Sequence, residues 1–212
     1  MRQDIKNIIF DLGGVLFNLD YKRSIIELQQ LLSYNFLTEP NLKSDILNHI
    51  AAYNRGSITT ERFIWKFQHL SKGKTPQGQD IIRAWNAMML GWNPEVFTML
   101  ASLRERYNLY LLSNINEIHF SFFQKSLKAF EGLTHFESHF IQTYYSHKLK
   151  LIKPDKAVYE LVLNQHNLQA SETLFIDDTE ENIISAQELG ISVVCHRPDS
   201  SIIDHIDSYL SI

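Results

Sequence analysis

The sequence predicts an α/β fold, in which a parallel sheet carries helices on both faces and an all-helical unit is inserted after the first strand. From about residue 92 onward, short apolar runs alternate with segments of helical periodicity, which is typical of right-handed crossovers between parallel strands. Between residues 17 and 91 the periodicity is helical, without a clear strand. We therefore expect a Rossmann-like core of residues 1–16 and 92–212, and a helical insertion at 17–91.

Five apolar runs have the length of buried strands, at residues 5–10, 109–112, 139–143, 173–176 and 192–195. Helix start signals lie between them. Asn93-Pro94-Glu95 joins a capping side chain to a first-turn proline and acid, and predicts a helix to about residue 106. Further helices are expected near 117–130, after Lys153-Pro154-Asp155, from Thr179 to a C-cap at Gly190, and over 202–210.

The insertion repeats apolar residues at spacings of three and four. One such series is Ile25, Leu28, Leu31 and Leu32. Breaks fall at residues 38–40, 55–57 and 72–78. The pattern predicts four or five helices, which would cover the turn that follows the first strand.

Composition narrows the function. The 212 residues are 44% hydrophobic and carry a net charge of −4, without the basic excess that nucleic-acid or anionic-membrane binding requires. No apolar run approaches the roughly 20 residues of a membrane span. The single cysteine, Cys195, excludes an internal disulfide. We expect a cytoplasmic protein whose N-terminus is a poor signal peptide; the sequence does not predict its oligomeric state.

Asp11 is the first candidate functional residue. It follows the apolar run Ile8-Ile9-Phe10 and precedes Gly13 and Gly14. A strand that ends in this way brings a carboxylate to the carboxyl edge of the sheet, where open α/β sheets bind ligands. The two glycines let the backbone approach a ligand closely. Asp11 is therefore expected to be a nucleophile or a metal ligand.

Three later segments should reach the same edge if the sheet is parallel. Ser113-Asn114 follows a strand, Lys153 stands at a helix start, and the acidic pair Asp177-Asp178 follows another strand. Three carboxylates this close repel one another unless a cation is present. Oxygen ligands of this kind suit Mg²⁺. The sequence thus predicts a divalent cation among Asp11, Asp177 and Asp178.

Together these segments resemble the motifs of the haloacid dehalogenase-like hydrolase superfamily, which contains mostly phosphatases. The motifs occur in the family order over nearly the whole chain, and the insertion lies where subfamily IA has its helical C1 cap. Phe10-Asp11-Leu12-Gly13-Gly14, Ser113-Asn114, Lys153-Pro154-Asp155 and Asp177-Asp178 with Asn182 look most like the branch that holds bacterial α-D-glucose-1-phosphate phosphatases.

The resemblance implies an Mg²⁺-dependent phosphatase of small phosphorylated metabolites, with sugar phosphates favoured. Asp11 would be the nucleophile and form an aspartyl-phosphate. Ser113, Asn114 and Lys153 would bind the phosphate, together with the Gly13–Gly14 turn. The metal ligands would be Asp11, the carbonyl of Gly13 and Asp178, with Asp177 as a further ligand or a residue behind them.

Two positions depart from the family pattern. Gly13 replaces the aspartate that normally protonates the leaving group, a function typically worth about 10²–10⁴-fold in rate. Either the substrate has a good leaving group, or a cap residue or water supplies the proton, or the protein turns over slowly or not at all. Lys150 stands where the family often has glycine, and is expected to point to solvent rather than add charge to the site.

Two other functions stay open. A protein that lost turnover with the acid at position 13 would be a binding module for phosphorylated ligands. A 2-haloacid dehalogenase would be metal-independent and would usually lack the pair Asp177-Asp178.

Overall fold

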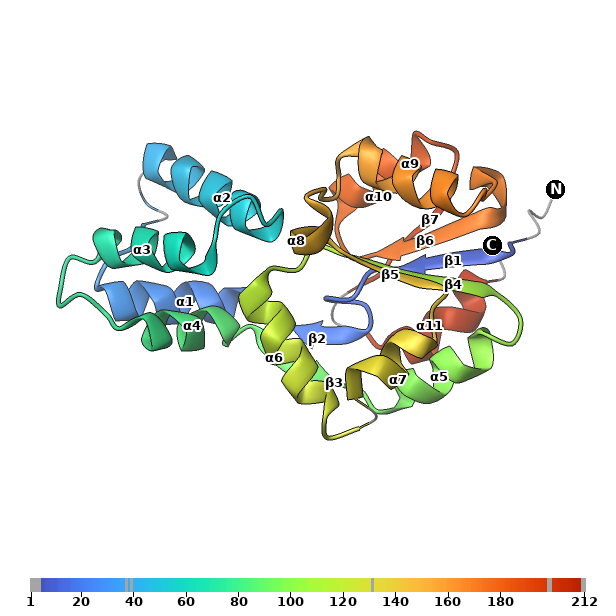
Figure 1. Ribbon diagram of the computed structural model, residues 1–212, viewed down its shortest axis with the longest axis horizontal. Helices are drawn as coiled ribbons and strands as arrows, with labels where there is room; N and C mark the ends of the chain where they lie inside the picture. The colour runs from blue at the N-terminus through green and yellow to red at the C-terminus, as the bar shows by residue number, and fades with distance from the viewer. Residues whose placement is uncertain (1–4, 37, 39, 131, 198–199, 211–212) are drawn as a thin grey trace.

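The computed structural model describes residues 5–36, 38, 40–130, 132–197 and 200–210. Its centre is a five-stranded sheet in the order β5-β4-β1-β6-β7, and every neighbouring pair is parallel (Figure 1). The strands are β1 (Asn7–Phe10), β4 (Asn108–Ser113), β5 (Gln142–Tyr145), β6 (Thr173–Asp177) and β7 (Ser192–Cys195). The α/β, Rossmann-like fold class is confirmed.

Helices cover both faces of this sheet (Figure 1). One face carries α9 (Lys156–Gln165) and α10 (Glu180–Gln187), and the other carries α5 (Glu95–Leu103), α6 (Glu117–Leu127), α7 (Gly132–Ser138) and α11 (Ile202–Tyr209). Alternate strand residues supply the two apolar layers: Ile8 and Phe10 pack on one side, and Ile9 packs on the other. Short helices α8 (Ser146–Leu149) and η1 (Ala170–Glu172) lie in the connections.

Four helices form a separate layer beside the sheet, at the left of Figure 1. They are α1 (Tyr21–Leu32), α2 (Pro40–Asn54), α3 (Thr60–Leu70) and α4 (Gly78–Asn86). Their apolar stripes meet in a core of their own, centred on Phe63 and Phe67. Asp20 caps α1 by accepting from the Lys22 amide at 3.1 Å, and Thr59 caps α3 by accepting from the Arg62 amide at 3.3 Å. In the described residues, no helix is long and apolar enough to cross a bilayer.

Two strands lie where the sequence shows only helical periodicity. β2 (Phe17–Leu19) and β3 (Met89–Trp92) form an antiparallel ribbon between α1–α4 and the core. Each strand is too short for an alternating pattern to be read from it, and the ribbon is held by Trp92, whose ring lies edge-on to Phe17 with centroids 5.0 Å apart. The expectation that no strand interrupts 17–91 is therefore wrong at its two ends.

The third expected strand begins later than residue 139. Residues 132–138 form α7, and β5 starts at Gln142. Phe136 of α7 and Phe140 of the turn after it pack together with ring centroids 5.3 Å apart, so part of the apolar run that suggested a strand belongs to a turn. The helices expected to reach 106 and 130 end at Leu103 and Leu127.

The turn between α2 and α3 rests on the core through polar contacts. Ser146 Oγ donates to the Asn54 carbonyl at 2.6 Å, and Thr60 Oγ1 donates to Glu117 Oε2 at 2.7 Å. Arg55 pairs with Asp155 at 2.9 Å. We refer to this segment, residues 54–60, as the docking turn. Through it the α1–α4 layer extends over the carboxyl edge of the sheet.

Lys150, exposed as expected, adds to the docking turn rather than to the carboxyl edge. Its ammonium donates to the Gly56 carbonyl, and it does not line the cavity described below.

Candidate active site

Parallel register gathers the predicted residues at one edge of the sheet. Phe10 of β1 stands level with Leu111 of β4 and Ile176 of β6, so Asp11, Ser113 and Asp177 follow at the same edge. The Asp11 amide donates to the Ile176 carbonyl at 2.9 Å, which continues the ladder by one residue and fixes where the carboxylate leaves the strand.

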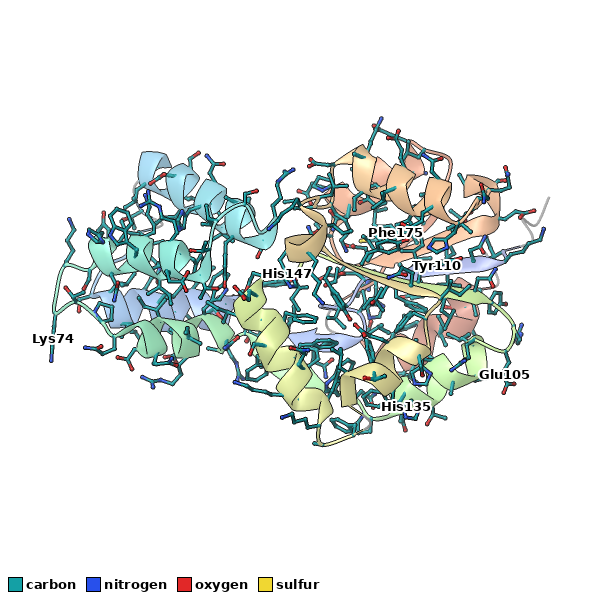
Figure 2. The ribbon with its side chains drawn as sticks, in the orientation of Figure 1. Lys74, Glu105, Tyr110, His135, His147 and Phe175 are labelled. Carbon is teal, nitrogen blue, oxygen red and sulfur yellow. The ribbon has the colours of Figure 1, made fainter. Side chains whose placement is uncertain are left out.

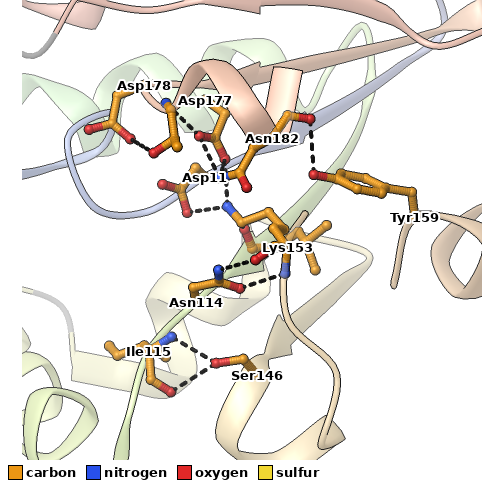
Figure 3. A network of polar contacts seen from close by, with 11 residues as sticks. Asp11, Asn114, Ile115, Ser146, Lys153, Tyr159, Asp177, Asp178 and Asn182 are labelled. Carbon is orange, nitrogen blue, oxygen red and sulfur yellow. Dashed lines mark hydrogen bonds and ion pairs between the residues drawn. The ribbon is translucent and has the colours of Figure 1, made fainter. Parts of the chain in front are cut away.

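Lys153 lies at the centre of the cluster (Figure 3). Its ammonium is 2.7 Å from Asp11 Oδ1 and 2.6 Å from Asp177 Oδ2, and donates to the Leu112 carbonyl at 2.8 Å. The residue is 2% exposed. Burial opposes the charge, but the two carboxylates outweigh it and raise the pKa of Lys153 above its ordinary value. A buried ammonium therefore links two strand ends.

Asn114 holds the loop that carries Lys153. Its Nδ2 donates to the Lys153 carbonyl at 2.8 Å, and its Oδ1 accepts from the Lys153 amide at 2.9 Å. This amide pair fixes the backbone of Lys153, so the four-carbon side chain enters the site from a rigid base. Both polar atoms of the Asn114 side chain are therefore engaged with this loop.

The two acids after β6 have different surroundings. Asp177 is 0% exposed and fully satisfied: it accepts from Lys153, from the Thr179 amide at 2.8 Å, and from Asn182 Nδ2 at 3.0 and 3.1 Å. Asp178 is partly exposed and accepts from Thr179 Oγ1 at 3.3 Å. Asp177 thus orients Lys153, whereas Asp178 keeps carboxylate oxygens available.

The three carboxylates form a compact oxygen cluster. Asp11, Asp177 and Asp178 each offer an oxygen within 4.8 Å of the other two. Burial raises the pKa of Asp11 to about 7. The Lys153 ammonium opposes this rise, and the neighbouring acids add to it. Burial and then Asp177 raise the pKa of Asp178 to about 6. A hard divalent cation would relieve this repulsion, and the donor set fits Mg²⁺.

Gly14 makes room for this cluster. A Cβ at Gly14 would lie 2.2 Å from Asp178 Oδ2, and φ there is +77°. Its amide donates to the Phe17 carbonyl at 2.9 Å, so Gly14 contributes space and a turn, and its N–H is not free for a phosphate. At Gly13 a Cβ would lie 2.5 Å from Leu19 Cδ1 and 4.0 Å from the Tyr21 hydroxyl.

A cavity of about 450 Å³ opens onto these residues. Ser113, 4% exposed, lines it, and within the described part of the chain its hydroxyl has no hydrogen-bond partner. Asp11, Gly13, Asn114 and Lys153 line the same cavity. The α1–α4 layer and the ribbon supply its opposite wall, through Leu19, Tyr21, Ile50, Asn54, Trp85, Met88 and Met89.

Sequence reasoning missed part of the site. Asn182, quoted only for its resemblance, anchors Asp177; its place in the first turn of the helix after the strand is a usable signal. The wall residues Ile50, Trp85 and Met88 carry no such signal, because their helical spacing is that of any packed helix. His147 and Lys74, labelled in Figure 2, do not line the cavity.

The chain has close relatives of known structure. Residues 8–196 match the family model for haloacid dehalogenase-like hydrolases. The chain is 27% identical over 193 residues to a D-ribitol-5-phosphate phosphatase of Bacteroides thetaiotaomicron, covering 88% of this chain and 89% of the relative. A haloacid dehalogenase family enzyme of Bacteroides thetaiotaomicron, solved with magnesium and inorganic phosphate, is 34% identical, with a TM-score of 0.78 over 93% and 96% of the two chains.

A hydrolase structure from Porphyromonas gingivalis, also described as haloacid dehalogenase-like, has a TM-score of 0.83 at 27% identity over 99% of both chains. The family match spans far more than half of the sequence, and it agrees with the parallel sheet and with the order of the strand-end residues. The chain belongs to the haloacid dehalogenase-like hydrolase family.

Proposed function

We propose that this chain is an Mg²⁺-dependent phosphatase of small phosphorylated metabolites. One observation carries the proposal: the buried Asp11–Lys153 ion pair lies at the edge of a cavity that also exposes the unpartnered hydroxyl of Ser113. A carboxylate, an ammonium and a hydroxyl donor are the groups that phosphoryl transfer from a monoester requires. The phosphatase relative and the magnesium- and phosphate-bound structure support it.

Asp11 would act as the nucleophile. Lys153 holds its Oδ1, and Oδ2 makes no hydrogen bond in the part of the chain that the structure describes. An Asp11 oxygen attacks phosphorus and forms an aspartyl-phosphate, while the ester P–O bond breaks and the departing oxygen takes a proton from a water molecule to leave as the alcohol. Water then attacks the phosphorus, which releases inorganic phosphate and restores the carboxylate. The Ser113 hydroxyl and the backbone N–H of Asn114 would hold the phosphate oxygens.

Asp11, Asp178 and the Gly13 carbonyl would hold Mg²⁺, with Asp177 behind them as the residue that positions Lys153. When bound, the cation supplies positive charge that offsets the phosphate and the crowded carboxylates. Residues 17–91 would form the cap of this site and residues 1–16 and 92–212 its core, so that closure excludes bulk water.

Phosphate release tests the proposal. With p-nitrophenyl phosphate, we expect turnover in Mg²⁺, loss of turnover in EDTA and full recovery when excess Mg²⁺ is added back. Binding of inorganic phosphate with no hydrolysis across a broad panel of esters would instead favour the binding module. Chloride release from a 2-haloacid in EDTA would favour the dehalogenase.

Tyr21 is the cap residue that we propose in place of the missing acid. Its hydroxyl lies 4.0 Å from where a Cβ at Gly13 would stand, and it lines the cavity. Half of the Tyr21 surface is exposed, but the end of the side chain that carries the hydroxyl is buried. This burial raises the pKa of Tyr21, and the nearby Asp178 carboxylate raises it further. The phenol therefore keeps its proton and can donate a hydrogen bond to the leaving oxygen.

We expect Tyr21→Phe to lower kcat for an alkyl phosphate by about 10²-fold, the usual value of one donor to developing charge. Turnover of p-nitrophenyl phosphate, whose leaving group needs no such help, should change little. Tyr107→Phe is the matched control, because Tyr107 does not line the cavity. Adding Gly13→Asp to Tyr21→Phe should restore alkyl phosphate turnover once the Leu19 side chain turns aside. Equal losses on both esters would exclude this function of Tyr21.

A further inference from the structure

The cavity wall opposite the phosphate-binding residues is apolar. Ile50 of α2, Trp85 of α4 and Met88 line it, and Ile115 continues the apolar surface from the core. Trp85 and Met88 are 5% and 6% exposed, so they are fixed in place by packing rather than projecting into solvent. A ligand that fills the cavity beyond its phosphate must contact this wall.

Two polar side chains at the wall, His119 and Asn54, already have partners within the protein. His119 Nε2 contacts the Trp85 carbonyl at 3.0 Å, its Nδ1 contacts Asn116 Nδ2 at 3.1 Å, and burial lowers the pKa of His119 to about 4, so it stays neutral. Asn54 Oδ1 accepts from Asn116 Nδ2 at 2.9 Å. Among the described residues of the cap wall, the Tyr21 hydroxyl and the Asn54 Nδ2 group remain for a ligand, and the buried indole N–H of Trp85 has no hydrogen-bond partner.

Binding of a polyol chain in such a cavity would cost free energy. Each hydroxyl that leaves water without a new partner is penalised, and the few free groups of this wall cannot satisfy the several hydroxyls of a sugar phosphate. An aliphatic or aromatic group loses no hydrogen bonds and gains from burial against Ile50, Trp85 and Met88. The chemistry of the wall therefore selects against hydroxylated substrates.

From this wall we infer that the substrates are monophosphate esters of alcohols with a largely apolar carbon skeleton, of a size that a cavity of about 450 Å³ admits. The inference rests on the proposed phosphatase activity and narrows it. It differs from the sugar phosphates that the sequence resemblance favours.

The test compares hexyl phosphate with D-ribitol 5-phosphate in Mg²⁺. Both are esters of primary alcohols, so the reacting centre is alike and the carbon skeleton differs. We expect kcat/KM for hexyl phosphate to be higher by at least about 10-fold, within the range that apolar pockets provide. Preference for ribitol 5-phosphate would overturn the inference.

A pair of variants on α2 assigns the preference to the wall. Ile50 is partly buried and lines the cavity, whereas Leu47 is 50% exposed on the same helix and does not. Ile50→Asn should raise KM for hexyl phosphate and leave or improve turnover of ribitol 5-phosphate, and Leu47→Asn should change neither. Equal losses on both esters in Ile50→Asn would contradict the inference.

Turnover of p-nitrophenyl phosphate shows whether the inferred substrate class is wrong or the proposed phosphatase activity itself is wrong. If this ester is hydrolysed but hexyl phosphate is not, the substrate class is wrong and the phosphatase stands. If no ester is hydrolysed in Mg²⁺, the proposed function itself fails.

Discussion

Asp11→Asn is expected to abolish phosphate release, with kcat lower by at least about 10⁴-fold, as losses of nucleophiles are. Asparagine has the same shape but cannot form the aspartyl-phosphate. Release of inorganic phosphate from p-nitrophenyl phosphate in Mg²⁺ measures the effect. The fold should persist, because Lys153 keeps Asp177 at 2.6 Å and the Leu112 carbonyl at 2.8 Å.

Asp204→Asn is the matched control for this variant, since Asp204 is exposed on α11 and does not line the cavity. It should retain full activity. Circular dichroism and thermal unfolding of both variants show whether folding is intact. A folded Asp11→Asn protein that still releases phosphate at the wild-type rate would exclude Asp11 as the nucleophile.

Lys153→Met is expected to remove activity and to destabilise the fold. The side chain of Lys153 is 1% exposed and pairs with two buried carboxylates, Asp11 and Asp177. Breaking a buried pair from one side leaves uncompensated charge, which lowers the free energy of unfolding by about 3–5 kcal/mol. Urea unfolding without added metal measures this loss.

The loss should depend on pH with a defined sign. Burial raises the pKa of Asp11 to about 7 in the folded protein, and Lys153 opposes that rise. For a carboxyl whose folded pKa is raised, the favourable contribution is complete below its unfolded pKa, about 3.9, and is lost as pH rises through the folded value. Without Lys153, the pKa of Asp11 in the folded protein rises further. The Lys153→Met protein should therefore be more destabilised relative to wild type at pH 8 than at pH 5.

Lys156→Met serves as the control, because Lys156 is half exposed and pairs with Glu188 at the surface. Its stability should stay within about 0.5 kcal/mol of wild type. A Lys153→Met protein that unfolds like wild type at pH 8 would contradict a structural need for the ammonium.

The convergence of the site residues could be predicted from the sequence, because the topology of a parallel sheet determines it. In a parallel sheet the strands that precede Asp11, Ser113 and Asp177 must end at one edge, and strong apolar runs mark those strands. Nothing in the sequence distinguishes the surroundings of Asp177 from those of Asp178. That difference depends on the Asn182 side chain and on the Lys153 loop, which meet only in the folded protein.

The ribbon and the cavity wall were beyond sequence reasoning for different physical reasons. β2 and β3 span three and four residues and gain their stability from each other and from Trp92. Trp85 has the spacing of any buried helix residue, and only the approach of α4 to the core turns it towards a cavity. Short strands and helix faces take their function from tertiary partners.

The ribbon also connects the α1–α4 layer to the core at two points. Both covalent links between the α1–α4 layer and the core pass through β2 or β3, so the layer would swing as one unit about this hinge. The docking turn also holds the layer on the core through exposed polar pairs such as Arg55 with Asp155, which water and salt weaken. Ionic strength would therefore tune how readily the cavity admits a substrate and releases phosphate, while the chemistry at Asp11 stays unchanged.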